Sequence, residues 1–150
     1  MSTISINFAS DLKKWAKKTE QGLDHVVKTA LVELSTEIIK RTPVGDPTFW
    51  KTKPPVGYIG GAARGNWFAS TGQPINTYDK NKIDKTGREA IAMATKAASK
   101  AVGKVYYLTN NLPYIRRIEY EAWAYAAPAG MVRVSVADFQ DALTNAVKSL

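Results

Sequence analysis

The sequence contains no cysteine, and its only histidine is His25. The lack of cysteine excludes a disulfide framework, a thiolate zinc site and a cysteine nucleophile. One histidine cannot supply the usual zinc sites, because these need further nitrogen or sulfur ligands. The G-x-S-x-G motif of nucleophilic serines and the G-x-x-x-x-G-K-[ST] motif of phosphate-binding loops are also missing. The sequence therefore predicts no metal and no cofactor.

Catalytic side chains are equally scarce. A Ser-His-acid triad stays open in principle, but His25 falls inside a predicted helix between Leu23 and Val26, where a structural role is favoured. The carboxylates are scattered, whereas paired-acid catalysis needs two of them in one cleft. We expect solvated or salt-bridged surface positions for Asp46, Asp79, Asp84, Glu89, Glu119, Glu121, Asp138 and Asp141. The sequence predicts that the protein is not an enzyme.

Long hydrophobic runs are absent as well. No stretch of about 18 apolar residues occurs, and the first residues lack an apolar segment, so neither a membrane span nor a signal peptide is expected. The 150 residues, 45% hydrophobic and 23% charged, are typical of one globular domain, 1–150. The net charge is +8, from 21 basic and 13 acidic residues. This charge is consistent with a solvated surface, a polyanionic partner or an acidic neighbouring protein.

Residues 8–41 read as one long amphipathic helix. Ser10 suits the N-cap, and Thr42-Pro43 stops the helix because the residue before a proline avoids the α region. Such a helix would exceed the width of a domain of this size, which is a first indication of assembly with neighbours. Apolar residues recur at steps of three or four along most of its length, namely Phe8, Leu12 and Trp15, then Leu23, Val26, Ala30, Leu34 and Ile38.

An extended loop, residues 42–64, follows this helix. It is rich in glycine, proline and tryptophan, and loops of such length are commonly functional or disordered. Disordered linkers contain few aromatic residues, whereas this loop contains Phe49, Trp50 and Tyr58. We therefore expect the loop to become ordered against its own core or against another subunit.

The remainder, 65–150, alternates between strands and helices. Strands are predicted at 65–70 and at 104–110, where β-branched and aromatic residues gather. Between them an alanine-rich helix begins near Thr86, which has capping-box spacing to Glu89, and ends at Gly103. A helical face built of alanine allows close approach of backbones, so this helix suits a position between other elements.

The C-terminal part contains two less regular patterns. The segment 113–130 is consistent with either a short helix or an irregular ladder, while 131–150 carries a helical stripe over its full length. Together the patterns predict an α+β fold, with a small, mainly antiparallel sheet packed by the long first helix, the alanine-rich helix and the C-terminal helix.

Five short motifs occur in order along the chain. They are Arg41-Thr42-Pro43-Val44, Gly61-Ala62-Ala63-Arg64-Gly65-Asn66-Trp67, Leu108-Thr109-Asn110-Asn111-Leu112-Pro113-Tyr114, Ile118-Glu119-Tyr120 and Ala127-Pro128-Ala129-Gly130-Met131-Val132-Arg133. This order resembles the head–tail joining, or tail-completion, proteins of tailed bacteriophages, and it covers nearly the whole chain. The inserted segment 46–60 departs from the pattern, since many members of that family pass almost directly from the first motif to the arginine of the second.

The resemblance implies a structural virion protein, assembled in the host cytoplasm and located at the neck of the particle. It implies a homo-oligomeric ring, six- or twelve-fold, that joins the tail tube to the connector on the portal side. Genomic DNA would pass through the ring without sequence-specific binding, and no membrane would take part. A basic nucleic-acid-binding protein is the alternative from a different class.

Subunit interfaces are enriched in tyrosine, tryptophan and arginine, which selects candidate residues in two segments. We expect some of these aromatic side chains to belong to the core instead, with Trp67 the foremost candidate because it lies on a predicted strand. The candidates are Phe49, Trp50, Tyr58, Arg64 and Trp67 in the first segment, and Tyr114, Arg116, Arg117 and Tyr120 in the second.

Overall fold

The structure is a computed structural model that describes residues 2–4 and 23–148. The first half of the predicted helix 8–41 lies outside the described residues. Its second half is helical as predicted, and so is most of 131–150. The elements in chain order are β1 (Ser2–Ile4), α2 (Leu23–Arg41), η1 (Pro47–Phe49), α3 (Ala62–Gly65), β2 (Phe68–Thr71), α4 (Arg88–Ala98), β3 (Tyr106–Asn110), α5 (Ile115–Tyr120) and α6 (Val132–Lys148).

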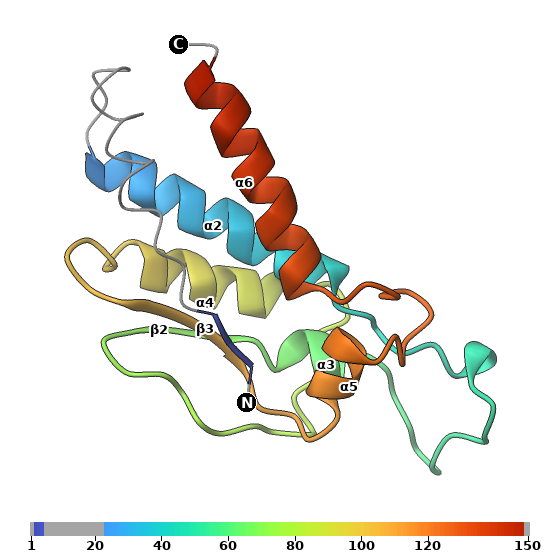
Figure 1. Cartoon of the computed structure of the whole chain (residues 1–150). Coiled ribbons are helices and arrows are strands. Elements are labelled where there is room, and N and C mark those ends of the chain that lie inside the picture. Colours follow the sequence, from blue (N-terminus) through green and yellow to red (C-terminus); the bar gives the residue numbers. More distant parts are fainter. Residues whose placement is uncertain (1, 5–22, 149–150) are drawn as a thin grey trace.

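The described strands form one antiparallel sheet in the order β1-β3-β2. Thr3 is opposite Thr109 on one side of β3, and Ala69 is opposite Leu108 on the other. Helix α4 lies against the sheet, α2 lies on α4, and α6 crosses α2 (Figure 1). The predicted α+β architecture is confirmed. Strand β1 was not predicted, because three residues are too few to show an alternating pattern.

The strand predicted at 65–70 begins later than expected. Residues Ala62–Gly65 form the short helix α3, and the chain becomes extended only from Phe68. Within 113–130 the structure contains a short helix, α5, so the first of the two alternatives for that segment is confirmed.

The predicted apolar face of α2 is buried. Ala30, Leu34 and Ile38 all belong to the main core. They contact the alanine-rich helix α4, which presents Ala90 and Ala94 from its own buried face. These methyl side chains allow α4 to pack closely between α2 and the sheet, as its composition predicted.

The end of α2 is tied to the core by a buried hydrogen-bond relay. The indole Nε1 of Trp67 donates to the hydroxyl of Thr42 at 2.7 Å, and that hydroxyl donates to the carbonyl of Ile38 at 2.8 Å. Trp67 and Thr42 are both 0% exposed. Trp67 is therefore a core residue, and its selection as a subunit-interface residue is wrong. Trp67 occupies the core, as expected for the foremost core candidate among the aromatic residues.

Asp84 caps the N-terminus of α4, which begins at Arg88. Its carboxylate accepts hydrogen bonds from the backbone N–H groups of Gly87, Glu89 and Ala90 and from the hydroxyl of Thr86. The predicted capping box of Thr86 with Glu89 is wrong, since the cap comes from further upstream. Asp84 is only 7% exposed, so the expectation of a surface carboxylate is also wrong.

Burial of the Asp84 carboxyl raises its pKa, but the hydrogen bonds from α4 and from Thr86 outweigh burial and leave the pKa below the ordinary value of 3.8. A depressed pKa means that the ionised form stabilises the folded state. This stabilisation is fully present above the unfolded-state pKa and is lost as the pH falls through the folded-state pKa.

We expect Thr42→Val to lower the free energy of unfolding by about 1–3 kcal/mol, because the buried indole N–H of Trp67 would lose its acceptor. The matched control is Thr95→Val. It removes a hydroxyl that also bonds a carbonyl one turn earlier, but from an exposed position, and we expect its effect to stay within about 0.5 kcal/mol. Urea denaturation measures both. Equal stability of wild type and Thr42→Val would contradict the relay.

We expect Asp84→Asn to lower the free energy of unfolding at pH 7 by about 0.5–2 kcal/mol, as for the loss of a helix cap. The difference in unfolding free energy between the variant and wild type should narrow once the pH falls below 3.8, the ordinary pKa of an aspartate, because the wild-type carboxylate then becomes protonated. Urea denaturation between pH 7 and pH 2 tests this, with the exposed Asp141→Asn as control. A gap of constant size across that range would contradict an ionised cap.

Candidate interaction surface

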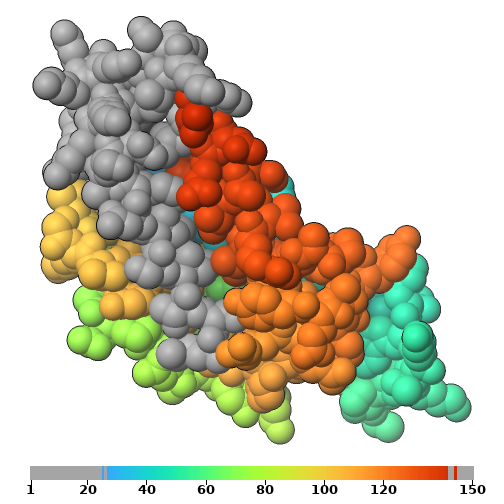
Figure 2. Space-filling view, viewed as in Figure 1, coloured from blue at the N-terminus to red at the C-terminus, as the bar shows by residue number. Residues whose placement is uncertain are grey.

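Seven aromatic side chains gather at one end of the molecule and form what we call the aromatic surface. Two segments supply them, the loop after α2 and the chain around and after α5, which lie side by side in Figure 2 (teal and orange). Tyr125 is 81% exposed, Phe49 66%, Tyr120 55% and Trp123 51%. The aromatic surface consists of Phe49, Trp50, Tyr58, Tyr114, Tyr120, Trp123 and Tyr125.

Ring contacts join the two segments. Phe49 stacks on Tyr125 with ring centroids 5.3 Å apart and planes 8° apart. Within the loop, the rings of Trp50 and Tyr58 are 4.6 Å apart, and the Tyr58 hydroxyl donates to the carbonyl of Gly45 at 3.0 Å. The loop is therefore ordered against its own subunit, one of the two possibilities that its composition left open.

The loop 45–60 closes at a narrow neck. The N–H of Gly61 donates to the carbonyl of Val44 at 2.6 Å, and a Cβ at Gly60 would lie 2.6 Å from that same carbonyl oxygen. Only glycine permits so close an approach of two backbones. The loop is thus a compact Ω-type excursion whose ends meet, held away from the sheet.

Arginine side chains lie over the aromatic rings. The guanidinium of Arg117 is 4.7 Å from the ring centroid of Trp123, while those of Arg133 and Arg116 are 4.8 Å and 5.7 Å from that of Tyr120. Such cation–π contacts hold the rings in fixed orientations while leaving their outer surfaces exposed. The surface therefore offers apolar area together with positive charge.

Tyr114 and Tyr58 lie at the less exposed side of the surface. Burial raises the pKa of Tyr114, and the nearby Tyr58 raises it further. Burial alone raises the pKa of Tyr58. Tyr114 also contacts Trp123, with ring centroids 5.9 Å apart. Both phenols thus stay neutral over the physiological pH range and take part as hydrogen-bonding, uncharged groups.

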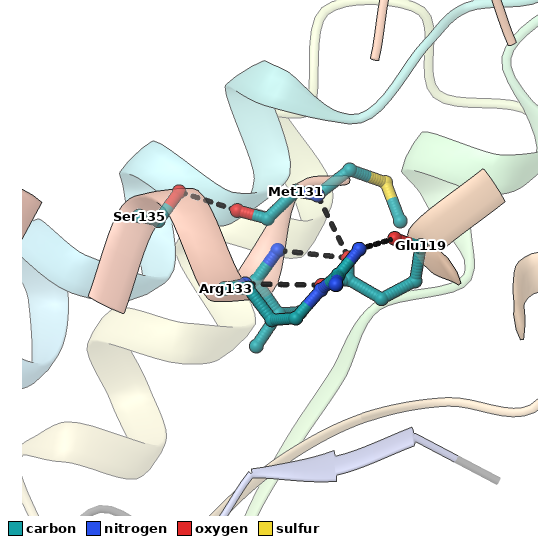
Figure 3. Close-up of polar contacts among 5 residues, drawn as sticks. Glu119, Met131, Arg133 and Ser135 are labelled. Atoms are coloured by element: carbon teal, nitrogen blue, oxygen red, sulfur yellow. Dashed lines mark hydrogen bonds and ion pairs between the residues drawn. The ribbon is translucent and has the colours of Figure 1, made fainter. Parts of the chain in front are cut away.

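Glu119 joins α5 to the start of α6, where its carboxylate faces Met131 and Arg133 (Figure 3). It is 1% exposed, and its carboxylate accepts from the N–H groups of Met131 at 2.7 Å, Val132 at 3.0 Å and Arg133 at 3.0 Å. These N–H groups at the start of α6 have no acceptor within the helix itself, and a negative charge is favourable at this end. The expectation of a surface position for Glu119 is therefore wrong, although its salt bridge with Arg133 agrees with that expectation in part.

Arg133 completes the joint between α5 and α6. Its Nε donates to the carboxylate of Glu119 at 3.2 Å, and its terminal nitrogen donates to the Glu119 carbonyl oxygen. Because the same guanidinium lies over Tyr120, the buried joint and the exposed surface share one side chain. Displacement of Glu119 would therefore also disturb the contact between Arg133 and the ring of Tyr120.

Two unusual backbone positions shape this segment. Gly130 has φ +86°, and a Cβ there would lie 2.6 Å from the carbonyl oxygen of Glu119. Ala122 has φ +49°, and it is the one non-glycine residue with a positive φ among those that the structure describes. This residue lies in the left-handed region and directly precedes Trp123. It turns the chain after α5, so that the ring of Trp123 comes to lie against Arg117 of that helix.

The structure brings together seven of the nine predicted interface residues. Trp67 is excluded by burial. Arg64 is separate from the surface, since its three guanidinium nitrogens donate to the carbonyls of Thr42, Lys85 and Lys40 at 2.9, 2.7 and 3.0 Å. Arg64 thus binds carbonyls at and just after the C-terminal end of α2 and one carbonyl before α4. These bonds explain its position without a contact to another subunit. The seven residues are Phe49, Trp50, Tyr58, Tyr114, Arg116, Arg117 and Tyr120.

Trp123, Tyr125 and Arg133 also belong to this region but were not among the predicted interface residues. The signal was present for the first two, because the stretch E-A-W-A-Y directly follows the selected Arg-Arg-Ile-Glu-Tyr and has the same aromatic character. Arg133 gave no such signal, since its place beside Glu119 and Tyr120 depends on the fold of α6 onto α5.

Within residues 2–4 and 23–148, no group of three or more histidine, cysteine, aspartate or glutamate side chains could hold a metal ion. In the same part of the chain, no helix combines the length and apolar character needed to cross a bilayer. No protein-family model, curated protein or solved structure matches the chain. The surface geometry and the sequence motifs therefore carry the functional argument.

We expect Gly130→Ala to cost about 1–3 kcal/mol more than Gly103→Ala, because the added methyl group meets the Glu119 carbonyl. Gly103 is the matched control, since its φ is +72° and a Cβ there would meet nothing within 4 Å. Both substitutions carry the strain of a left-handed alanine, about 1–2 kcal/mol. Urea denaturation of the two variants isolates the contact, and equal losses would show that Glu119 moves aside without cost.

Proposed function

We propose that the protein is a structural virion protein that forms a ring at the head–tail interface of a tailed bacteriophage. It would join the tail tube to the connector on the portal side, around the DNA channel. The observation that carries the proposal is the aromatic surface, because contiguous exposed apolar area rimmed by charge is typical of interaction sites. Tyrosine, tryptophan and arginine are also the residue types that dominate interface energetics.

The positions of the motif residues support the resemblance on which this proposal rests. Thr42, Trp67, Glu119 and Gly130 all lie in buried joints between elements that are distant in sequence. Residues with such structural roles are the ones that a shared fold would retain. The inserted segment, by contrast, supplies exposed rings of the aromatic surface, so it is suited to contacts particular to this protein.

A closed ring needs an interface between two different faces of each copy, with a rotation that returns to the start. In our proposal the aromatic surface is one of these faces, and the neighbouring copy supplies the other. Phe49 and Tyr125 are the most exposed rings, and they stack on one another at its outer rim. They should therefore contribute to association far more than to folding.

We expect the double variant Phe49→Ser/Tyr125→Ser to fold normally but to associate at least about 30-fold more weakly, as for the loss of one interface hot spot of about 2 kcal/mol. The control is Tyr78→Ser, which removes a ring that is 49% exposed and comes from neither segment of the aromatic surface. Sedimentation velocity and electron microscopy measure association and ring formation, and circular dichroism checks the fold.

Rings that form equally well from the double variant would contradict the role of the aromatic surface. A wild-type protein that remains monomeric, both alone and when mixed with the tail-tube and connector proteins of its own phage, would contradict the proposed function itself.

A further inference from the structure

A hollow of about 530 Å³ lies at the end of the molecule opposite to the aromatic surface. Its lining residues come from the start of α2 and from the end of α4 with the turn that follows. These segments lie on the left in Figure 1, whereas the loop 45–60 projects on the right. Its lining includes the cationic or titratable side chains of His25, Lys28, Lys100 and Lys104. We propose that this lysine hollow binds the phosphates of double-stranded DNA, without reading its sequence.

The hollow is built on a rigid base. His25 and Lys28 are three residues apart and so share one face of α2. Lys100 and Lys104 come from the turn after α4, in which the N–H of Lys104 donates to the carbonyl of Ala101 at 3.0 Å. Beneath them a small second core of buried side chains joins the two helices, formed by Leu31, Ala98 and Ala101.

The positive charge in the hollow is not neutralised by the part of the chain that the structure describes. All four of these side chains are exposed, and none of the lining residues that the structure describes is acidic. The ion pairs found among the described residues instead involve Arg41, Arg117 and Arg133. Three neighbouring lysines of like charge create a positive potential that an anionic ligand would relieve.

Residue chemistry favours DNA over an acidic protein as the ligand. Protein interfaces are enriched in arginine and aromatic residues and depleted in lysine, and among the described residues the lining of the hollow contains neither arginine nor an aromatic ring. Lysine ammonium groups are compact charges that contact phosphate oxygens in many orientations, which holds DNA without specifying its sequence.

The same composition favours duplex over single-stranded DNA. Proteins that bind single strands stack bases on aromatic side chains, and the lining residues within 23–148 include no ring for that purpose. A duplex presents its phosphates outwards with its bases already stacked, so lysines alone suffice to bind it.

This inference goes beyond the proposed ring, because assembly at the aromatic surface needs no DNA and the hollow needs no assembly. The test uses the full chain and a fluorescent duplex, with anisotropy measured over a series of salt concentrations. The hollow variant is Lys28→Gln/Lys100→Gln/Lys104→Gln. The control, Lys40→Gln/Lys53→Gln/Lys80→Gln, removes the same charge from exposed positions outside the lining of the hollow.

We expect the hollow variant to bind the duplex at least about 10-fold more weakly than the control variant. Loss of three phosphate contacts should also reduce the slope of log K against log salt by about 2.7, at about 0.9 for each contact. Lysine-to-arginine changes at the same three positions should retain binding, and duplexes of different sequence should bind equally.

Four results would overturn the proposal: no binding of duplex by wild type, equal losses in the hollow and control variants, tighter binding of single-stranded than duplex DNA, or poly-glutamate binding that depends on the hollow as strongly as DNA does. The variant Phe49→Ser/Tyr125→Ser separates the two proposals, since it should lose assembly and keep DNA binding. DNA binding without assembly would contradict only the proposed ring, and assembly without DNA binding would contradict only the proposed DNA site.

Discussion

The hydrogen bond from the indole of Trp67 to the hydroxyl of Thr42 joins the end of α2 to the chain that leads into the sheet. Both groups are fully buried, so each would be costly without its partner. Arg64 reinforces the same point by donating to the last carbonyls of α2. The direction in which the chain leaves α2, and therefore the position of the loop 45–60, depends on this joint.

Two buried carboxylates extend this principle to the rest of the fold. Asp84 lies in the irregular segment before α4 and caps that helix, while Glu119 lies in the short helix α5 and caps α6. A buried charge must be surrounded by donors, and helix N-termini supply several N–H groups at once. Segments with little regular structure of their own are thereby held in place, including the one that presents Trp123 and Tyr125.

The surface chemistry differs between the two ends of the molecule. Arginines and aromatic rings gather around the loop 45–60, where Arg117 and Arg133 lie over exposed rings. Lysines gather at the start of α2 and after the end of α4. Arginine and aromatic groups suit contacts with protein, and lysines suit contacts with phosphate. The two proposals therefore assign different partners to separate faces.

Local patterns were sufficient for α2, α4, β3 and α6. Burial of Ala30, Leu34 and Ile38 follows from a period of 3.6 residues, and the end of α2 follows from the proline after Thr42. Most of the aromatic surface could also be predicted, because interface residue types are recognisable from composition. Tertiary packing confirmed Trp67, the foremost core candidate, as a core residue. The burial of Asp84 and Glu119 and the place of Arg64 depended on tertiary packing alone. These side chains have partners that the chain brings near only once the helices pack on the sheet, so no spacing in the sequence could reveal them.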